Sequence, residues 1–188
     1  GAIEYFSKNA KAYEQVRLAI AGMEAAGKPS PDFEAWTKQI EAMRNPDGTC
    51  GQGASQAFDT GGVAAALLRM GVKLDKKDAV LNALRAGQHA DGGWSKGEGP
   101  SDLEATYRVM RAFYMMKETP DLAKLLGFVA SCRHSDGSYS VKAGGTDIGG
   151  SYYATTVIRW ARLLNGEPAF VETAGFAPLF NGKDLTRS

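Results

Sequence analysis

The sequence predicts an all-α protein built from repeated helical hairpins, because one turn motif recurs at a constant interval between helix-like runs. The dipeptide Asp-Gly begins at Asp47, Asp91 and Asp136, at spacings of 44 and 45 residues. A run of apolar residues with helical periodicity precedes and follows each copy. A period of this length is typical of stacked pairs of helices. We therefore expect each repeat to consist of a helix, an Asp-Gly turn and a second helix.

The helices before the turns carry one apolar stripe each. We expect them at residues 32–44, 76–88 and 121–133. In the second of these helices, Val80, Leu81 and Leu84 recur at helical spacing. One buried face is typical of a helix on the outside of a layered structure.

The helices after the turns are apolar over most of their surface. We expect them at residues 58–70, 102–117 and 149–164. In the second of these helices, Tyr107, Val109, Met110 and Phe113 leave little polar surface. A helix of this kind is buried on two sides. The second helices should therefore form an inner layer and the first helices an outer one.

The chain begins with a further helical run, which we expect to form one helix over residues 4–26. Gly27 closes it, and Pro29 and Pro31 follow. This helix resembles the inner helix of an earlier repeat without its outer partner. The prediction is then about three and a half hairpins in a domain that spans residues 1–166.

Residues 167–188 break the repeat pattern and are expected to form an irregular tail. Pro168 and Pro178 interrupt it, and a short apolar strand pattern at residues 174–180 precedes the Asn181-Gly182 turn signal. We expect this tail either to pack on the helices or to begin a following β domain.

Composition bounds the classes of partner. The 188 residues carry a formal net charge of +1, so no global field would attract nucleic acid. No apolar stretch approaches the roughly 20 residues of a membrane span. Cys50 and Cys132 are too few for a disulfide framework or a closed zinc site, and their redox state stays open.

The second turn resembles the QW motif of squalene and hopene cyclases, which combines Gln, Gly and Trp. Here these are Gln88, Gly92 and Trp94. The other two copies are degenerate and read Arg44, Gly48, Cys50 and Arg133, Gly137, Tyr139. Residues 4–164 are similar to the prenyltransferase and terpenoid-cyclase superfamily. This resemblance implies an α/α toroid, or an open arc of one, with QW-like Asp-Gly loops.

Most conspicuous polar and aromatic residues of the turns have structural roles in this interpretation. Asp-Gly supplies a turn in which Gly adopts positive φ. The following aromatic residue packs on the helix end. The residues assigned to these structural repeat positions are Gln88, Asp91, Gly92, Trp94, Asp136, Gly137 and Tyr139. His89 and His134 occupy one repeat position, which favours turn residues over metal ligands or bases.

The resemblance also implies activities whose residue sets this sequence lacks. Protein prenyltransferases bind zinc through Asp, Cys and His, and the matching positions here hold Glu104, Thr106 and Gly150. The cyclase acid motif Asp-x-Asp-Asp has no match. The thioester motif Cys-Gly-x-Gln is approached at Cys50, but Gly53 replaces the required Gln. We therefore predict no metal and no cofactor.

Functional groups of this architecture belong at the loop-rich mouth, where the inner helices begin. The candidate ligand-binding residues there are Asp59, Asp102, Glu104, Tyr107, Asp147 and Tyr153. Helix capping is the alternative role for Asp59 and Asp102. Catalytic residues are not identified.

Two classes of function remain open. The favoured one is a binding or scaffolding domain of a larger bacterial protein, with a hydrophobic small molecule or another protein chain as partner. The alternatives are an enzyme of the prenyltransferase or terpenoid-cyclase class and a module of a carbohydrate-active protein. The last rests on Gly175–Leu185, which is similar to the opening strand of the 3-keto-disaccharide hydrolase family. That similarity implies an exported or periplasmic protein.

Overall fold

The computed structural model describes residues 1–142 and 148–168, and in these ranges it contains helices and no strand. The predicted all-α fold is confirmed. The helices are α1 (Ala2–Asn9), α2 (Tyr13–Ala26), α3 (Phe33–Glu41), α4 (Gln56–Arg69), α5 (Lys77–Ala86), α6 (Leu103–Met116), α7 (Leu122–Ser131) and α8 (Ile148–Leu164), with a 3-10 turn at Gly53–Ser55.

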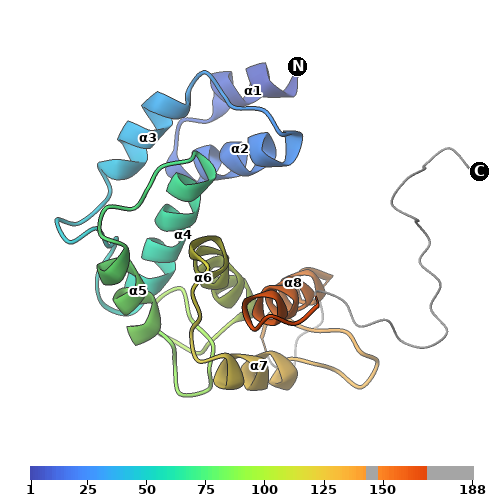
Figure 1. Ribbon diagram of the computed structural model, residues 1–188. Coiled ribbons are helices and arrows are strands. Elements are labelled where there is room, and N and C mark those ends of the chain that lie inside the picture. Colours follow the sequence, from blue (N-terminus) through green and yellow to red (C-terminus); the bar gives the residue numbers. More distant parts are fainter. Residues whose placement is uncertain (143–147, 169–188) are drawn as a thin grey trace, which may run out of the picture.

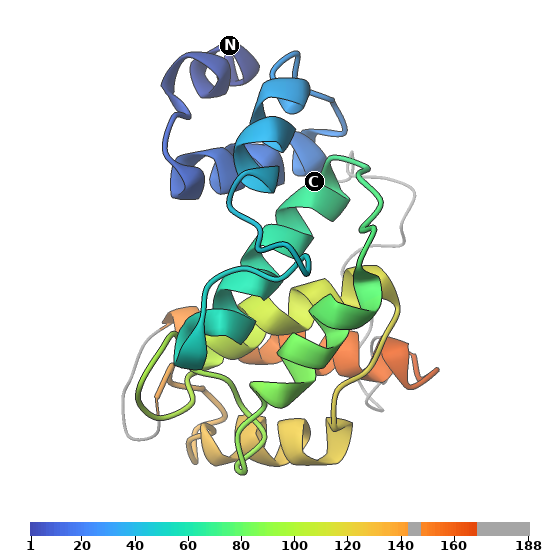
Figure 2. The same cartoon turned by 90° about the vertical axis from the view of Figure 1, so that its left-hand side faces the viewer.

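The helices form two layers that follow an open arc (Figure 1). The inner layer consists of α2, α4, α6 and α8, in which each helix packs against the next. The outer layer consists of α3, α5 and α7 on the convex side, where α3 and α5 face the viewer in Figure 2. This is the arrangement expected of an α/α toroid in its open form.

The core is divided along the arc. One apolar cluster joins α2, α3 and the second half of α4, and a larger one extends from α4 to α8. Val109 and Phe113 of α6 are fully buried at the centre of the larger cluster. A Cβ added to Gly61 would lie 3.1 Å from the Cα of Val109. The backbones of α4 and α6 therefore approach closely because Gly61 has no side chain.

The single helix expected over residues 4–26 is wrong, because the chain breaks between α1 and α2. Ala10 is buried and extended at φ −79° and ψ 97°. The side-chain oxygen of Gln15 accepts the backbone N–H groups of Lys11 and Ala12 at 3.1 and 3.0 Å. This cap starts a new helix at Tyr13. The half hairpin predicted at the start of the chain therefore contains two helices, the short α1 and the longer α2.

The four inner helices end in one common way. Each is followed by a residue in the left-handed conformation, and the next N–H bonds back to the final turn. These left-handed residues are Gly27 (φ 63°), Gly71 (φ 81°), Lys117 (φ 57°) and Gly166 (φ 75°). The repeat therefore persists in the backbone up to the last described residues.

The three Asp-Gly turns share one geometry. A carboxylate oxygen of Asp47, Asp91 and Asp136 accepts the N–H two residues later, at 2.9, 3.0 and 2.9 Å. The glycines that follow have φ of 88°, 97° and 89°. These are Asx turns with a left-handed residue that glycine adopts without strain.

A hydroxyl of the following inner helix fixes the exit of each turn. The N–H groups of Cys50, Trp94 and Tyr139 donate to the hydroxyls of Thr60, Thr106 and Ser151, at 2.9, 3.1 and 3.0 Å. Each hydroxyl thereby accepts a backbone N–H of the turn that would otherwise lack a hydrogen-bond partner.

Trp94 and Gln88 join the second turn to its surroundings. Trp94 is fully buried, and its indole N–H donates to the Leu84 carbonyl at 2.8 Å. The amide of Gln88 donates to the carbonyls of Gly92 and Asp121, both at 3.0 Å, and accepts the Asp121 N–H at 3.1 Å. Gln88 thus connects its own turn to the start of α7 in the next repeat.

Candidate functional site

The concave face of the inner layer contains a cavity of about 480 Å³, lined by residues of α2, α4, α6 and α8. Glu104, Tyr107 and Tyr153 lie in its wall. Asp59 and Asp102 do not line it. Asp147 lies outside the described residues. The structure thus brings three of the six candidate residues together in one cavity.

Asp59 and Asp102 stabilise the starts of their helices. Asp102 is 5% exposed, and its carboxylate accepts the N–H of Ala105 at 2.8 Å as the N-cap of α6. Asp59 lies in the first turn of α4 and accepts the Ser55 hydroxyl at 2.8 Å. Both carboxylates are engaged in local structure.

Four arginines that were not predicted from the sequence line the cavity. They are Arg17, Arg69, Arg108 and Arg111. A signal was present, since Arg69, Arg108 and Arg111 are charged residues on helices that are apolar over most of their surface. Charge on a buried helix usually has a specific partner or function.

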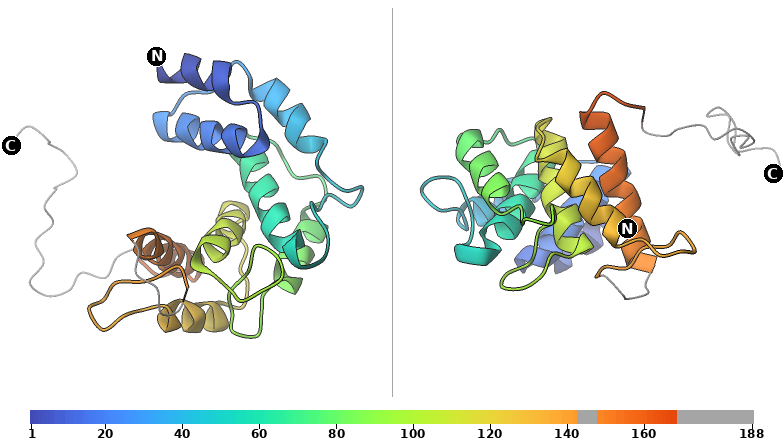
Figure 3. Two further views of the ribbon diagram at one scale, coloured as in Figure 1. Left: turned by 180° about the vertical axis from the view of Figure 1, so that it is seen from behind. Right: turned by 90° about the horizontal axis from the view of Figure 1, so that it is seen from below.

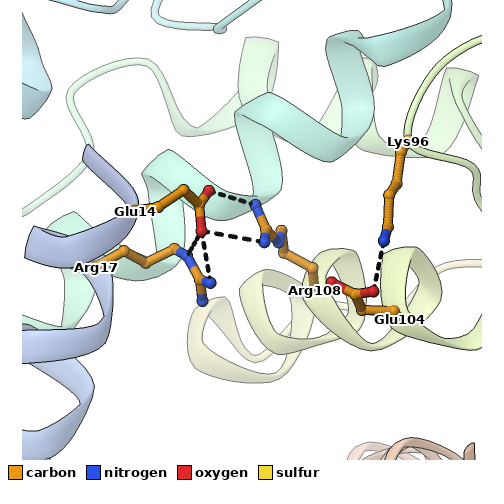
Figure 4. Close-up of polar contacts among 5 residues, drawn as sticks. All are labelled: Glu14, Arg17, Lys96, Glu104 and Arg108. Atoms are coloured by element: carbon orange, nitrogen blue, oxygen red, sulfur yellow. Dashed lines mark hydrogen bonds and ion pairs between the residues drawn. The ribbon is translucent and has the colours of Figure 1, made fainter. Parts of the chain in front are cut away.

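A carboxylate of α2 holds two of these arginines (Figure 4). The Glu14 carboxylate accepts hydrogen bonds from Arg17 at 2.7 Å and from Arg108 at 3.0 Å. The guanidinium of Arg108 also lies 4.1 Å from the ring centre of Phe58. Two of the four positive charges are therefore shared with one carboxylate.

Arg69 is held in a largely buried position. Its side chain is 6% exposed, and Nε lies 2.8 Å from a carboxylate oxygen of Glu24. Burial, together with the like charge of Arg111, lowers the pKa of Arg69. Two guanidinium groups that raise each other's electrostatic energy favour a bound anion between them.

Arg111 lies on aromatic rings. Its guanidinium is 4.9 Å from the ring centres of both Tyr107 and Trp160. It donates to the Tyr107 hydroxyl, which is 3.1 Å from the Tyr152 hydroxyl. Within residues 1–142 and 148–168, Arg111 has no ion pair with a carboxylate. We call Arg69, Arg111, Tyr107 and Tyr152 the arginine–tyrosine cluster.

The Tyr152 hydroxyl of this cluster stays protonated near neutral pH. The hydrogen bond with Tyr107, followed by burial, raises the pKa of Tyr152 above its ordinary value. A neutral phenol can donate a hydrogen bond to an anion. The cluster therefore presents guanidinium and phenol donors side by side.

The residues at the family's zinc positions do not fit that metal. The Thr106 hydroxyl is fully buried and accepts the Trp94 N–H, and Glu104 pairs with Lys96 (Figure 4). A Cβ at Gly150 would lie 2.4 Å from the Tyr139 carbonyl oxygen, so a histidine could not replace it. The described ranges hold no group of three His, Cys, Asp or Glu side chains suited to a metal.

The histidines lie in the turns. His89 Nδ1 is 3.1 Å from the Ser101 hydroxyl, which donates to Asp91 at 2.8 Å. Because Ser101 is 6% exposed and donates directly to the Asp91 carboxylate, this arrangement stabilises the turn. His134 occupies the equivalent turn.

None of the helices that the structure describes has the length and apolarity required to cross a bilayer.

Comparisons with known proteins agree with this architecture. The family model of the prenyltransferase alpha-alpha toroid domain matches residues 16–173. A comparison with curated proteins found no match. The matched span begins in α2 and contains every helix of the two layers that follows it. The chain therefore belongs to the prenyltransferase α/α-toroid domain family.

Proposed function

We propose that this domain is a binding module whose concave face takes a ligand with a negatively charged head and an apolar body. The observation that carries the proposal is Arg111, a cation stacked on two aromatic rings with no carboxylate partner in the described residues. A guanidinium fixed in this way has little rotamer entropy left to lose on binding.

The cluster fits the chemistry of a phosphate or carboxylate head. The planar guanidinium presents paired N–H donors that match two oxygens of such a group. Arg69 adds a second positive charge, and Tyr152 adds a hydroxyl beside it. Glu24 neutralises only one of the two guanidinium charges.

Aromatic rings next to the cluster supply an apolar wall. Tyr107 and Tyr153 line the cavity, and their ring centres are 5.1 Å apart. A volume of about 480 Å³ lies in the range of small-molecule sites. A prenyl diphosphate combines both chemical features and is consistent with the family. The module would serve as one domain of a larger bacterial protein.

Titration of the full chain with three probes tests this function. We expect farnesyl diphosphate to bind more tightly than either farnesol or inorganic pyrophosphate, measured by calorimetry. Loss of a charge-assisted contact in Arg111→Gln should weaken farnesyl diphosphate roughly 10- to 100-fold. Lys38→Gln removes one positive charge from an exposed position of α3 and should leave the affinity unchanged. Equal weakening by both variants would contradict the proposal.

An enzyme acting on an isoprenoid is the competing function, and Glu104 in the cavity wall is the carboxylate that favours it. Incubation with farnesyl diphosphate, followed by analysis of released diphosphate and of the prenyl product, separates the two. Turnover that disappears in Glu104→Gln would establish the enzyme and overturn the binding role. Binding without any product supports the module.

A further inference from the structure

Glu24 is a carboxylate in the last turn of α2, and it lies in the wall of the concave cavity. The helix macrodipole disfavours a negative charge at this end of a helix. Glu14 lies in the first turn of the same helix, where the dipole stabilises it. Because the position of Glu24 costs helix stability, the reason for an acid there lies in what its side chain contacts.

Three neighbouring inner helices bring charged side chains together at this point. Figure 3 (left panel) shows α4 between α2 and α6 along the arc, and α4 packs against both. Glu24 lies on α2, Arg69 at the end of α4 and Arg111 on α6, and all three line the cavity. One carboxylate therefore accompanies the two guanidinium groups of the arginine–tyrosine cluster.

Glu24 holds Arg69 by charge rather than by an aligned hydrogen bond. A Glu24 oxygen lies 2.8 Å from Arg69 Nε, yet this buried N–H forms no hydrogen bond within the part of the chain that the structure describes. Glu14 differs, because it accepts hydrogen bonds from Arg17 and Arg108. A buried donor without a hydrogen bond costs free energy. The Glu24 contact is therefore an incomplete substitute for a bound anion at Arg69.

The carboxylate lies on the solvent side of this ion pair. The side chain of Glu24 is 47% exposed, whereas that of Arg69 is 6% exposed. An anion that binds between Arg69 and Arg111 must therefore lie beside the negative charge of Glu24. The repulsion between two anions is proportional to the product of their charges. A head with several negative charges is thus opposed more strongly than a head with one.

We propose that Glu24 is a specificity-determining residue, which discriminates among anionic heads by opposing those of high charge. The inference rests on the proposed function, because it concerns the ligand of the same cavity. Glu24 shares Arg69 with the bound head, and Arg111 supplies the remaining positive charge. A carboxylate head meets weak repulsion from Glu24, whereas a diphosphate head meets strong repulsion. The affinity for a diphosphate is therefore lower than two uncompensated guanidinium groups would give.

Two ligands with one apolar body and different heads test this role in the full chain. Farnesyl diphosphate carries several negative charges near neutral pH, and farnesoate carries one. We expect Glu24→Gln to bind farnesyl diphosphate roughly 5- to 20-fold more tightly than the parent protein does, by calorimetry. For farnesoate the gain should be at most about twofold. Glu34→Gln removes the same charge from an exposed position of α3 and should change neither affinity.

The relative change for the two heads decides the result. Equal gains for both heads, or no gain for farnesyl diphosphate, would overturn the proposal. Weaker binding of both ligands would overturn it too, because Glu24 would then orient Arg69 for the ligand. Because Glu24 is half exposed and the amide oxygen of Gln can still contact Arg69, we expect Glu24→Gln to remain folded.

A second measurement separates this inference from the proposed function. Inorganic pyrophosphate carries the charge without the apolar body, and a ligand that binds the folded state raises the melting temperature. We expect pyrophosphate to raise the melting temperature of Glu24→Gln more than that of the parent protein or of Glu34→Gln. If neither farnesyl ligand binds any of the three proteins, the proposed function fails, and this larger shift still supports the role of Glu24. Equal shifts in that case would overturn the role as well.

Discussion

The carboxylate of Glu14 on α2 accepts hydrogen bonds from Arg108 on α6, at 3.0 and 3.5 Å, across the inner face of α4 (Figure 4). Gly62 of α4 lies beneath this pair. A Cβ at this position would be 3.4 Å from Arg108 Cδ and 2.8 Å from the Tyr13 hydroxyl oxygen. The ion pair thus spans three inner helices because the middle one presents a glycine.

Glu14→Gln should lower stability near neutral pH and make it less sensitive to acid. Burial raises the pKa of Glu14, but hydrogen bonds from Arg17 and Arg108 outweigh it and hold the pKa below its ordinary value. A lowered pKa contributes stability above the ordinary pKa, and this contribution is lost as pH falls through the lowered one. Because Glu14 is about half exposed, we expect a loss of only about 0.5 kcal/mol at neutral pH, by urea unfolding.

The control for Glu14→Gln is Glu34→Gln, which removes an exposed pair with Lys38 on α3. We expect it to change stability less than Glu14→Gln does. The difference between the Glu14→Gln variant and the parent protein should vanish as the pH approaches about 3. A difference that persists in acid would show that Glu14 acts by packing alone.

Gly92→Ala should destabilise the protein more than Gly137→Ala. Both glycines have φ near 90°, so both substitutions carry a left-handed cost of about 1–2 kcal/mol. Only the Cβ at position 92 would collide with the backbone of α7. This overpacking should add roughly 1–3 kcal/mol. Thermal unfolding of the two variants measures the difference, and equal losses would contradict the close packing of the second turn on α7.

Thr106→Val should cost more stability than Ser151→Ala. The Thr106 hydroxyl is fully buried and accepts the Trp94 N–H, so its removal leaves a buried donor without an acceptor. Such a loss costs about 1–3 kcal/mol. Ser151 serves Tyr139 in the same way but is half-buried, and water can replace it. Urea unfolding of both variants checks this order, and the reverse order would show that the buried donor finds another acceptor.

The carboxylates of Asp47 and Asp136 should titrate below their ordinary range. The Ser138 hydroxyl and then its backbone N–H lower the pKa of Asp136, and Thr49 lowers that of Asp47 in the same way. Ser138→Ala should raise the pKa of Asp136 only part of the way, because the N–H remains. Thr49→Ala should leave Asp136 unchanged. Carboxyl chemical shifts followed by NMR against pH report both values, and an unchanged Asp136 pKa in Ser138→Ala would contradict this assignment.

The sign of the acid effect follows from these lowered pKa values. Asp47 and Asp136 each contribute to stability at neutral pH, and the contribution is lost as pH falls through the lowered pKa. The parent protein should therefore lose thermal stability in acid, and Asp136→Asn should lose less.

Local periodicity predicted the fold to a large extent. The interval between Asp47, Asp91 and Asp136 located the hairpins, and the apolar surfaces of the helices assigned them to inner and outer layers. The break at Ala10 was missed because it depends on a cap from Gln15 and on burial of Ala10, which a periodic pattern does not record.

The candidate site was predicted only in part. Glu104, Tyr107 and Tyr153 lie in the cavity, but the arginines were overlooked. Arg69 and Arg111 come from different repeats, and their proximity arises only when α4 and α6 pack side by side. The curvature of the helical arc brings such residues together, and it cannot be deduced from one sequence.

The sequence by itself determined the helical repeat, because turn chemistry and apolar periodicity act over a few residues. Tertiary structure alone decided which charges face the concave cavity and which glycines admit a neighbouring backbone. These features depend on the packing of helices from different repeats. There, differences of less than an ångström in contact distance and the removal of water decide the energy.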